Sequence, residues 1–124
     1  MPLIMGGNLY LNGALPHEQD ENPMVLGQER LDAKLIRKED GFYLEWASNP
    51  EWIDGQKRQL ITTEMLGKAI VPDMKYEQAD GSPLVIDTDY YGNARNKSNP
   101  APGPFEGLEE GKQLIKIWPN QMPK

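Results

Sequence analysis

Apolar and polar residues alternate most regularly between residues 31 and 46. The alternation is interrupted once, at Glu39-Asp40-Gly41, a sequence typical of a tight turn. A period of two predicts β-strands with one buried face, so we expect a β-hairpin here. The apolar positions expected on its buried face are Leu31, Ala33, Leu35, Phe42, Leu44 and Trp46.

The chain before this hairpin is less regular. Two short apolar pieces, 3–5 and 8–11, flank Gly6-Gly7, which predicts two strand segments joined at a kink or bulge. Asn12-Gly13 predicts a turn. Residues 15–23 are polar and show no period, so we expect a loop there.

The second half contains short strand candidates at 59–63, 69–71, 84–86 and 114–118, separated by turn residues. We expect a helical turn that begins at Thr63 as N-cap and ends at Gly67. The 84–86 strand is expected to pair with 75–77 across the Asp80-Gly81 turn.

A second turn is expected from Asp87 to Asn93. In the last strand, alternation places Ile115 and Ile117 on one side. The other side should carry Leu114, Lys116 and Trp118.

Composition limits the possibilities further. The 124 residues, with 12 Gly and 11 Pro, favour one small domain rich in turns and short strands. A fold of this size ordinarily buries about two thirds of its unfolded surface, enough for independent stability. The net charge of −6 disfavours nucleic acid and anionic membrane as partners, and no apolar run approaches a membrane span. The sequence lacks Cys, which excludes disulfides and thiolate metal sites.

A longer phrase spans residues 80–106. It reads Asp80-Gly-Ser-Pro-Leu-Val-Ile-Asp-Thr-Asp-Tyr-Tyr-Gly-Asn-Ala-Arg95 and, further on, Asn99-Pro-Ala-Pro-Gly-Pro-Phe-Glu106. This phrase resembles the closing segment of right-handed parallel β-helix proteins, many of which are carbohydrate-active enzymes. A similar but less specific likeness is carried by Asn8, Tyr10, Asn12, Gly13, Ala14, Pro16, Asp20, Asn22 and Pro23. Ala94, where proline is common in this family, and the residues after Glu106 depart from the pattern.

The resemblance implies an all-β chain formed by the C-terminal coils and cap of such a β-helix, with residues 1–124 as one β-rich unit. The rest of the β-helix and a polysaccharide would be its partners, in a secreted or periplasmic glycoside hydrolase or polysaccharide lyase. An alternative is a small β-sandwich that binds carbohydrate or another protein without catalysis. A cytoplasmic structural protein is a third possibility, which no residue pattern favours.

Candidate chemistry within the chain is sparse. We expect no catalytic residue, no metal site and no cofactor. His17 lies in a polar loop and is expected to be solvated. Asp87-Thr88-Asp89 and Gly92 match part of a calcium loop, but Ser98 stands where a bidentate Glu is required. We therefore expect a turn whose carboxylates accept local backbone N–H groups.

Two clusters of side chains remain as candidate binding groups. Trp52, Tyr90 and Tyr91 offer aromatic faces on which sugar rings can stack, and Trp52, between Pro50 and Gly55, is the one expected to be exposed. A polyanionic glycan would need a basic patch, and residues Lys34, Arg37 and Lys38 either form one or are a solvated strand face.

Overall fold

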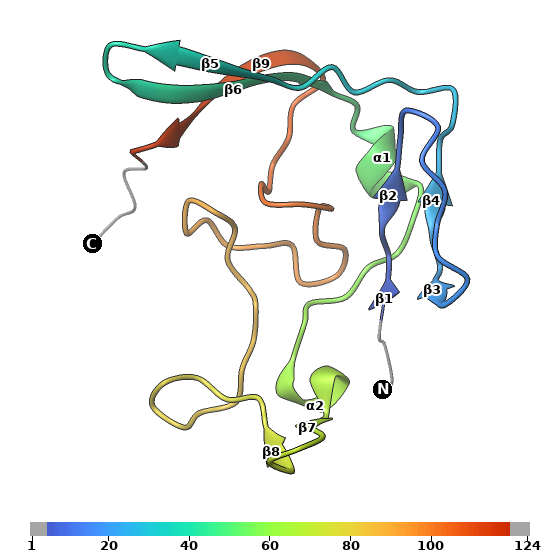
Figure 1. Cartoon of the computed structure of the whole chain (residues 1–124), viewed down its shortest axis with the longest axis vertical. Coiled ribbons are helices and arrows are strands. Elements are labelled where there is room, and N and C mark those ends of the chain that lie inside the picture. Colours follow the sequence, from blue (N-terminus) through green and yellow to red (C-terminus); the bar gives the residue numbers. More distant parts are fainter. Residues whose placement is uncertain (1–4, 120–124) are drawn as a thin grey trace.

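The computed structural model describes residues 5–119 and is mainly β (Figure 1). The all-β prediction is therefore confirmed. The elements, in chain order, are β1 (Met5–Gly6), β2 (Leu9–Tyr10), β3 (Asp20–Glu21), β4 (Met24–Val25), β5 (Lys34–Lys38), β6 (Gly41–Ser48), α1 (Glu51–Asp54), α2 (Thr63–Leu66), β7 (Lys68–Ala69), β8 (Met74–Lys75) and β9 (Gly111–Trp118).

The first four strands form two parallel pairs, β1 with β3 and β2 with β4. Every pairing joins residues 15 positions apart, as in Met5 with Asp20. The β1–β2 segment bends at Gly7 (φ 68°), and the β3–β4 segment bends at Asn22 (φ 57°). These two left-handed residues are also 15 positions apart. The expected kink at Gly6-Gly7 is thus confirmed, whereas residues 3 and 4 lie outside the described range.

The expectation of a loop over residues 15–23 is wrong at its end, because β3 lies there. Asp20 and Glu21 are polar and give no apolar signal. Their strand conformation depends on pairing with β1, a partner that a local pattern does not reveal.

The hairpin prediction is confirmed, since β5 and β6 pair antiparallel around the turn before Gly41. The sheet has the order β5-β6-β9. β5 begins at Lys34, so Leu31 and Ala33 lie outside the strand. At Gly41 (φ 141°) a Cβ atom would lie 2.0 Å from the carbonyl oxygen of Trp118, which leaves room for glycine alone.

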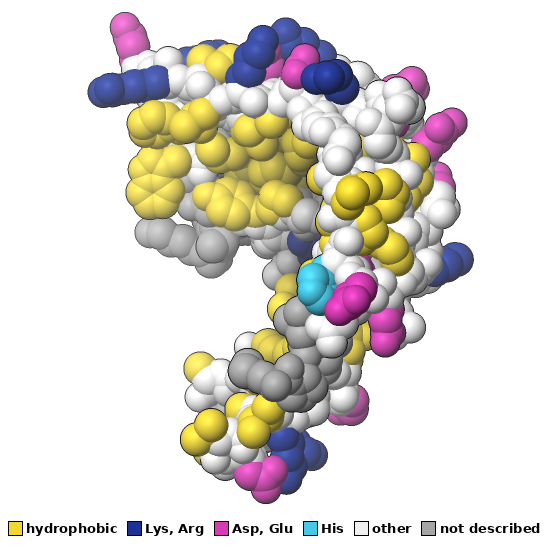
Figure 2. All heavy atoms as spheres, turned by 45° about the vertical axis from the view of Figure 1, so that its right-hand side comes forward, with side chains coloured by type: hydrophobic (Ala, Val, Ile, Leu, Met, Phe, Trp, Pro, Cys, Tyr) yellow, Lys and Arg dark blue, Asp and Glu magenta, His cyan; other side chains and the backbone are white. Residues whose placement is uncertain are grey.

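The two faces of this sheet differ as the alternation predicted. One face carries Lys34, Tyr43, Glu45 and Lys116, because Lys34 lies opposite Glu45 in the strand register and Tyr43 lies opposite Lys116. Figure 2 shows Lys and Arg side chains along this outer side and a broad apolar area beneath it. Lys34, Arg37 and Lys38 are all exposed, which supports their interpretation as solvated residues. Arg37 lies opposite Phe42 in the register and therefore does not share a face with the two lysines.

The predicted burial of the apolar face is wrong at one end. Leu35 and Leu44 are directly paired, but Leu35 is 64% exposed and Phe42 is 37% exposed. Trp46 is half-buried because Phe105 packs edge-on against it at 5.7 Å between ring centroids. The described chain covers the Trp46 end of the face and leaves the Leu35 end open.

The last strand is longer than predicted and contains an irregularity. The register shifts between Phe42 and Tyr43, so that Tyr43 pairs with Lys116 whereas Phe42 pairs with Trp118. Directly paired residues share a face, so Trp118 lies with Phe42 on the apolar side. The expectation that Trp118 shares a side with Lys116 is therefore wrong, because a bulge changes the alternation.

The middle of the chain is held by turns and short pairings. The N-cap of α2 is Thr62, not Thr63, since the Thr62 hydroxyl accepts the N–H of Met65. Residues 61–63 pair antiparallel with 84–86 through Thr63 N–H to Leu84 O and Ile86 N–H to Ile61 O. The expected pairing of 75–77 with 84–86 is therefore wrong. Glu77 instead forms an isolated antiparallel β-bridge with Pro83. The strand predicted at 69–71 is observed one residue earlier and is shorter, as β7, which pairs antiparallel with β8.

The path of the chain is open (Figure 1). Within residues 5–119, the nearly buried hydrophobic side chains are Trp52, Ala101 and Phe105. The sheets in this range lie apart from one another and do not stack face to face, so a β-sandwich is not observed there. The described part of the chain also has no helix with the length and hydrophobicity of a membrane span.

Candidate functional site

A cleft of about 820 Å³ lies between the β1–β2 segment, α1, residues 57–66 and the loop at 100–104. Most of its lining is apolar and includes Leu9, Ile53, Leu60, Ile61, Met65 and Leu108. The polar side chains of its lining include those of Glu21, Asn22, Asn49, Lys57, Arg58 and Arg95. This cleft is where a ligand or partner could be enclosed.

Arg58 forms one wall of the cleft and is 9% exposed. Its Nε donates to Gly7 O at 2.8 Å, and Nη1 donates to Ile53 O at 3.1 Å. Its Nη2 donates to Trp52 O at 3.2 Å and to Gln56 Oε1 at 2.7 Å. All four acceptors are uncharged. Burial lowers the pKa of the guanidinium, although an arginine stays protonated at neutral pH.

These contacts join segments that are far apart in sequence. The Arg58 backbone N–H donates to Asn99 Oδ1 at 2.8 Å, and Asn99 Nδ2 donates to Ile53 O at 3.1 Å. A Cβ on Gly7 would lie 3.2 Å from Cγ of Arg58, so glycine allows this close approach as well as the left-handed bend. Arg58 therefore connects the first bend, α1 and the loop around Asn99. This role of Arg58 could not be predicted from local sequence patterns, because it depends on tertiary placement.

Trp52 is not where the sequence suggested. The expectation that it is exposed is wrong, since it is 7% exposed and lies within α1. Pro50 and Gly55 indicated a break in the chain, but they flank a single helical turn whose buried side is Trp52. Its indole is thus part of the small core, and its predicted contact with sugar stays a prediction without an exposed ring to support it.

Tyr90 and Tyr91 belong to an aromatic cluster around Phe105. Tyr91 stacks on Phe105 at 5.8 Å between centroids, and Tyr90 lies edge-on to both rings. The Tyr90 hydroxyl donates to Ile117 O at 2.6 Å, and the Tyr91 hydroxyl donates to Lys116 O. Both tyrosines therefore attach the 88–106 loop to β9. Tyr90 is 37% exposed, so part of it stays accessible to solvent.

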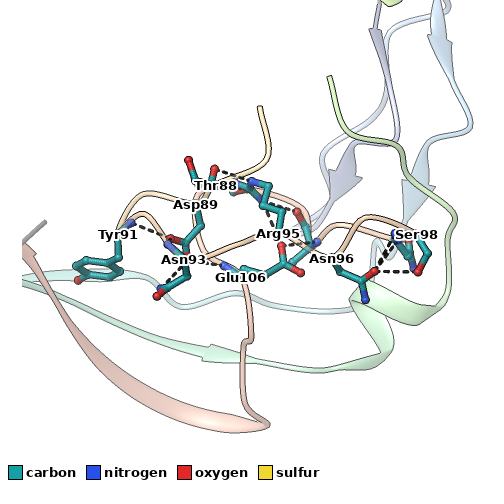
Figure 3. Close-up of polar contacts among 11 residues, drawn as sticks. Thr88, Asp89, Tyr91, Asn93, Arg95, Asn96, Ser98 and Glu106 are labelled. Atoms are coloured by element: carbon teal, nitrogen blue, oxygen red, sulfur yellow. Dashed lines mark hydrogen bonds and ion pairs between the residues drawn. The ribbon is translucent and has the colours of Figure 1, made fainter. Parts of the chain in front are cut away.

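Asp89 is the centre of a hydrogen-bond network in this loop (Figure 3). Its Oδ1 accepts the backbone N–H groups of Tyr91 and Asn93, both at 2.9 Å. Its Oδ2 accepts Asn93 Nδ2 at 3.2 Å and the Glu106 N–H at 3.1 Å. Burial raises the pKa of this carboxyl, but the hydrogen bonds outweigh it and the net shift is downward.

The predicted structural turn is therefore confirmed at Asp89, whose two oxygens are occupied by N–H donors. In the described residues no group of three or more acidic or His side chains could hold a metal ion.

A second pair completes the loop. Arg95 Nη1 lies 3.4 Å from Glu106 Oε2, which also accepts the Ala101 N–H at 3.1 Å. Arg95 further donates to Thr88 O and Gly103 O. Asp89, Arg95 and Glu106 are three of the charged residues of the 80–106 phrase, and their hydrogen bonds hold this loop together (Figure 3).

The parallel strands contain one further buried carboxylate. Asp20 is 8% exposed, and its Oδ2 accepts Asn8 Nδ2 at 3.0 Å and the Tyr10 hydroxyl at 2.5 Å. The hydrogen bond to Asp20 raises the pKa of Tyr10. His17 is exposed, as expected, and its Nδ1 accepts the Gln19 N–H at 3.1 Å. These side chains stabilise the strand pair and the loop that connects it.

Comparison with known proteins gives one informative similarity. No family model matches the chain, and no curated protein matches it. A solved structure, the complex of XylC with xylose, aligns over 94% of this chain with a TM-score of 0.81 and 30% sequence identity. The aligned region is 18% of the XylC chain. The present chain thus shares its fold with a small part of XylC and spans less than a fifth of the length of that protein.

Proposed function

We propose that residues 1–124 form the C-terminal, non-catalytic part of a carbohydrate-active parallel β-helix protein, where they end and cap the coils. The observation that carries this proposal is the repeat in the first four strands. Two consecutive segments pair in parallel at a constant offset, and their left-handed bends, Gly7 and Asn22, are aligned. Stacked coils of a β-solenoid require this arrangement.

The similarity to XylC supports the carbohydrate-related part of the proposal. XylC was solved with xylose, and 94% of this chain matches its fold. Because the match covers 18% of XylC, the remaining coils and the catalytic groups of such a protein would lie elsewhere in a longer polypeptide. That protein would be a glycoside hydrolase or a polysaccharide lyase, secreted or periplasmic, with a polysaccharide as its substrate.

The non-catalytic part of the proposal follows from how the acidic side chains are used. General acid–base catalysis needs an acid and a base that converge on a cleft. Asp89 and Glu106 are occupied by backbone N–H groups, and Asp20 is bonded to Asn8 and Tyr10. His17 lies exposed in a loop. These residues stabilise structure, so we assign the chain a supporting role.

A second candidate function is glycan contact at the edge of the 88–106 loop. The partly exposed ring of Tyr90 favours it, since an aromatic face packs against the C–H groups of a sugar ring. Substitution of Tyr90 by Ala should then weaken retention of the chain on insoluble xylan, whereas Tyr76→Ala, which also changes a partly exposed tyrosine, should not. Equal retention of both variants would remove this candidate.

An activity screen tests the main proposal. Purified 124-residue protein is incubated with xylan, pectic, alginate and galactan substrates, and reducing ends and the absorbance of unsaturated products are measured. We expect no turnover. Turnover that persists through repurification and is lost when Asp or Glu residues of this chain are substituted would show that the chain is itself an enzyme.

A further inference from the structure

The folded chain exposes far more surface than a self-contained protein of its mass. Its accessible surface is 9103 Å². A folded monomer of 14.0 kDa exposes about 6,700 Å², so the excess is roughly 2,400 Å². The chain buries about 55% of its extended surface, whereas about 67% is expected for its size. It therefore falls short of the two thirds that its length predicted.

This excess is large compared with a protein interface. A stable complex typically buries about 800 Å² on each partner, and obligate interfaces bury more and are more apolar. The excess here is about three times the typical value. One obligate, apolar interface of this size would restore ordinary burial, whereas a bound sugar of one or two rings would cover a small fraction of it.

Two features locate part of this interface. The first is the cleft, whose lining is dominated by aliphatic side chains such as Leu60, Ile61 and Met65. The second is the edge of the parallel strands that border it. Within residues 5–119, β1 and β2 each have a single strand neighbour, so one edge of each is unpaired. Unpaired strand edges are normally covered or paired in native proteins.

We propose that the cleft is one half of a protein interior, completed by the β-helix coil that precedes β1 in a longer polypeptide. This inference rests on the proposed function and specifies its partner. The preceding coil pairs in parallel with the free edge of β1 and β2, as β3 and β4 pair with the other edge. Its inward-facing apolar side chains fill the cleft and cover Leu60 and Ile61.

The buried polar group of the cleft, Arg58, favours a polypeptide over a sugar. A sugar ring carries several hydroxyl groups, and a site that recognises them offers free donors and acceptors. Here Arg58 has four of its N–H groups bonded to carbonyl oxygens of the same chain, so little of this buried guanidinium is free for a sugar hydroxyl. A backbone strand also satisfies the unpaired edge of β1 and β2, which a sugar does not.

The test uses the 124-residue chain and two observations. Hydrogen exchange should be fast at the amides of Gly6 and Leu9 and slow in the centre of β6, because the free edge lacks its partner strand. The dye ANS should bind, and the double substitution Leu60→Gln/Ile61→Gln should lower its fluorescence several-fold. Leu15→Gln is the matched control, since Leu15 is 80% exposed and outside the cleft. Near-UV circular dichroism of the Phe105 cluster verifies that each variant is folded.

Two results would overturn the inference. Slow exchange at Gly6 and Leu9 together with ANS binding unaffected by the double substitution would show that the cleft is closed. Displacement of ANS by xylotriose, with slower exchange at residues 57–61, would identify a sugar pocket and leave the carbohydrate-active proposal intact. Because exchange is measured on the unmodified chain, the test does not depend on the variants. Failure of the proposed function itself would be recognised separately, as turnover by this chain.

Discussion

Asp89→Asn should destabilise the 88–106 loop strongly, and the structure gives the size of the effect. The substitution keeps Oδ1 as acceptor for Tyr91 and Asn93 but replaces Oδ2 by an NH₂ group. That group then faces two donors, the Glu106 N–H and Asn93 Nδ2. Each hydrogen bond to a charged acceptor contributes about 1.5–3 kcal/mol, so losing two of them in a buried site should cost about 3–6 kcal/mol.

The matched control is Asp87→Asn, two residues away. Asp87 is exposed, and among the described residues its carboxylate makes no hydrogen bond, so the change should stay within about 0.5 kcal/mol. Urea unfolding followed by near-UV circular dichroism reports on the aromatic cluster around Phe105. Equal free energies of unfolding for the two variants would refute the claim that Asp89 organises this loop.

The same carboxylate predicts a pH dependence. The pKa of Asp89 is lower in the folded chain than in the unfolded chain. Its contribution is therefore complete above the unfolded pKa of about 3.9 and is lost as the pH falls through the folded pKa. The pKa values of Asp40 and Asp80 are lowered as well, so the wild type minus Asp89→Asn difference isolates Asp89. That difference should shrink below about pH 4, and a constant difference would contradict the assignment.

Three further predictions follow from the packing. Trp46→Ala should lower the free energy of unfolding in urea by more than about 1 kcal/mol, because Trp46 contacts Phe105. Trp118→Ala should lower it by less, since Trp118 is 61% exposed. The reverse order would mean that the apolar face is covered at the other end. Thr62→Ala should cost about 1 kcal/mol through loss of the α2 N-cap, and Thr62→Ser should restore most of it, so failure of Ser to do so would argue against capping. EDTA should leave the melting temperature unchanged, because N–H groups occupy both oxygens of Asp89; a drop that calcium reverses would show a metal-dependent turn.

Local patterns predicted the parts of the fold whose cause is local. The hairpin at 34–48 follows from alternation and from the turn residues before Gly41, and the Asp80–Ser82 turn follows from a carboxylate that accepts the Ser82 N–H. The 80–106 phrase identified the loop that Asp89 and Arg95 hold together. In each case neighbouring residues supply most of the interactions, so the nearby sequence is sufficient to predict the element.

The remaining features depend on distant partners. β3 is polar and becomes a strand through pairing with β1. Arg58 is a charged residue in a polar stretch, yet it is buried because three carbonyl oxygens from other segments converge on it. Leu35 alternates as a buried residue should and is nevertheless exposed. Alternation identifies which side of a strand is apolar, but not whether the chain itself covers that side.

The proposed function requires that this region belongs to a much longer β-helix protein. The direct measurement is the intact mass of the natural protein that contains residues 1–124, captured from its source with an antibody against this chain and analysed by mass spectrometry. The account predicts a polypeptide several times heavier than 14.0 kDa, whose preceding sequence contains repeats of coil length. A mature, monomeric species of 14.0 kDa would contradict it.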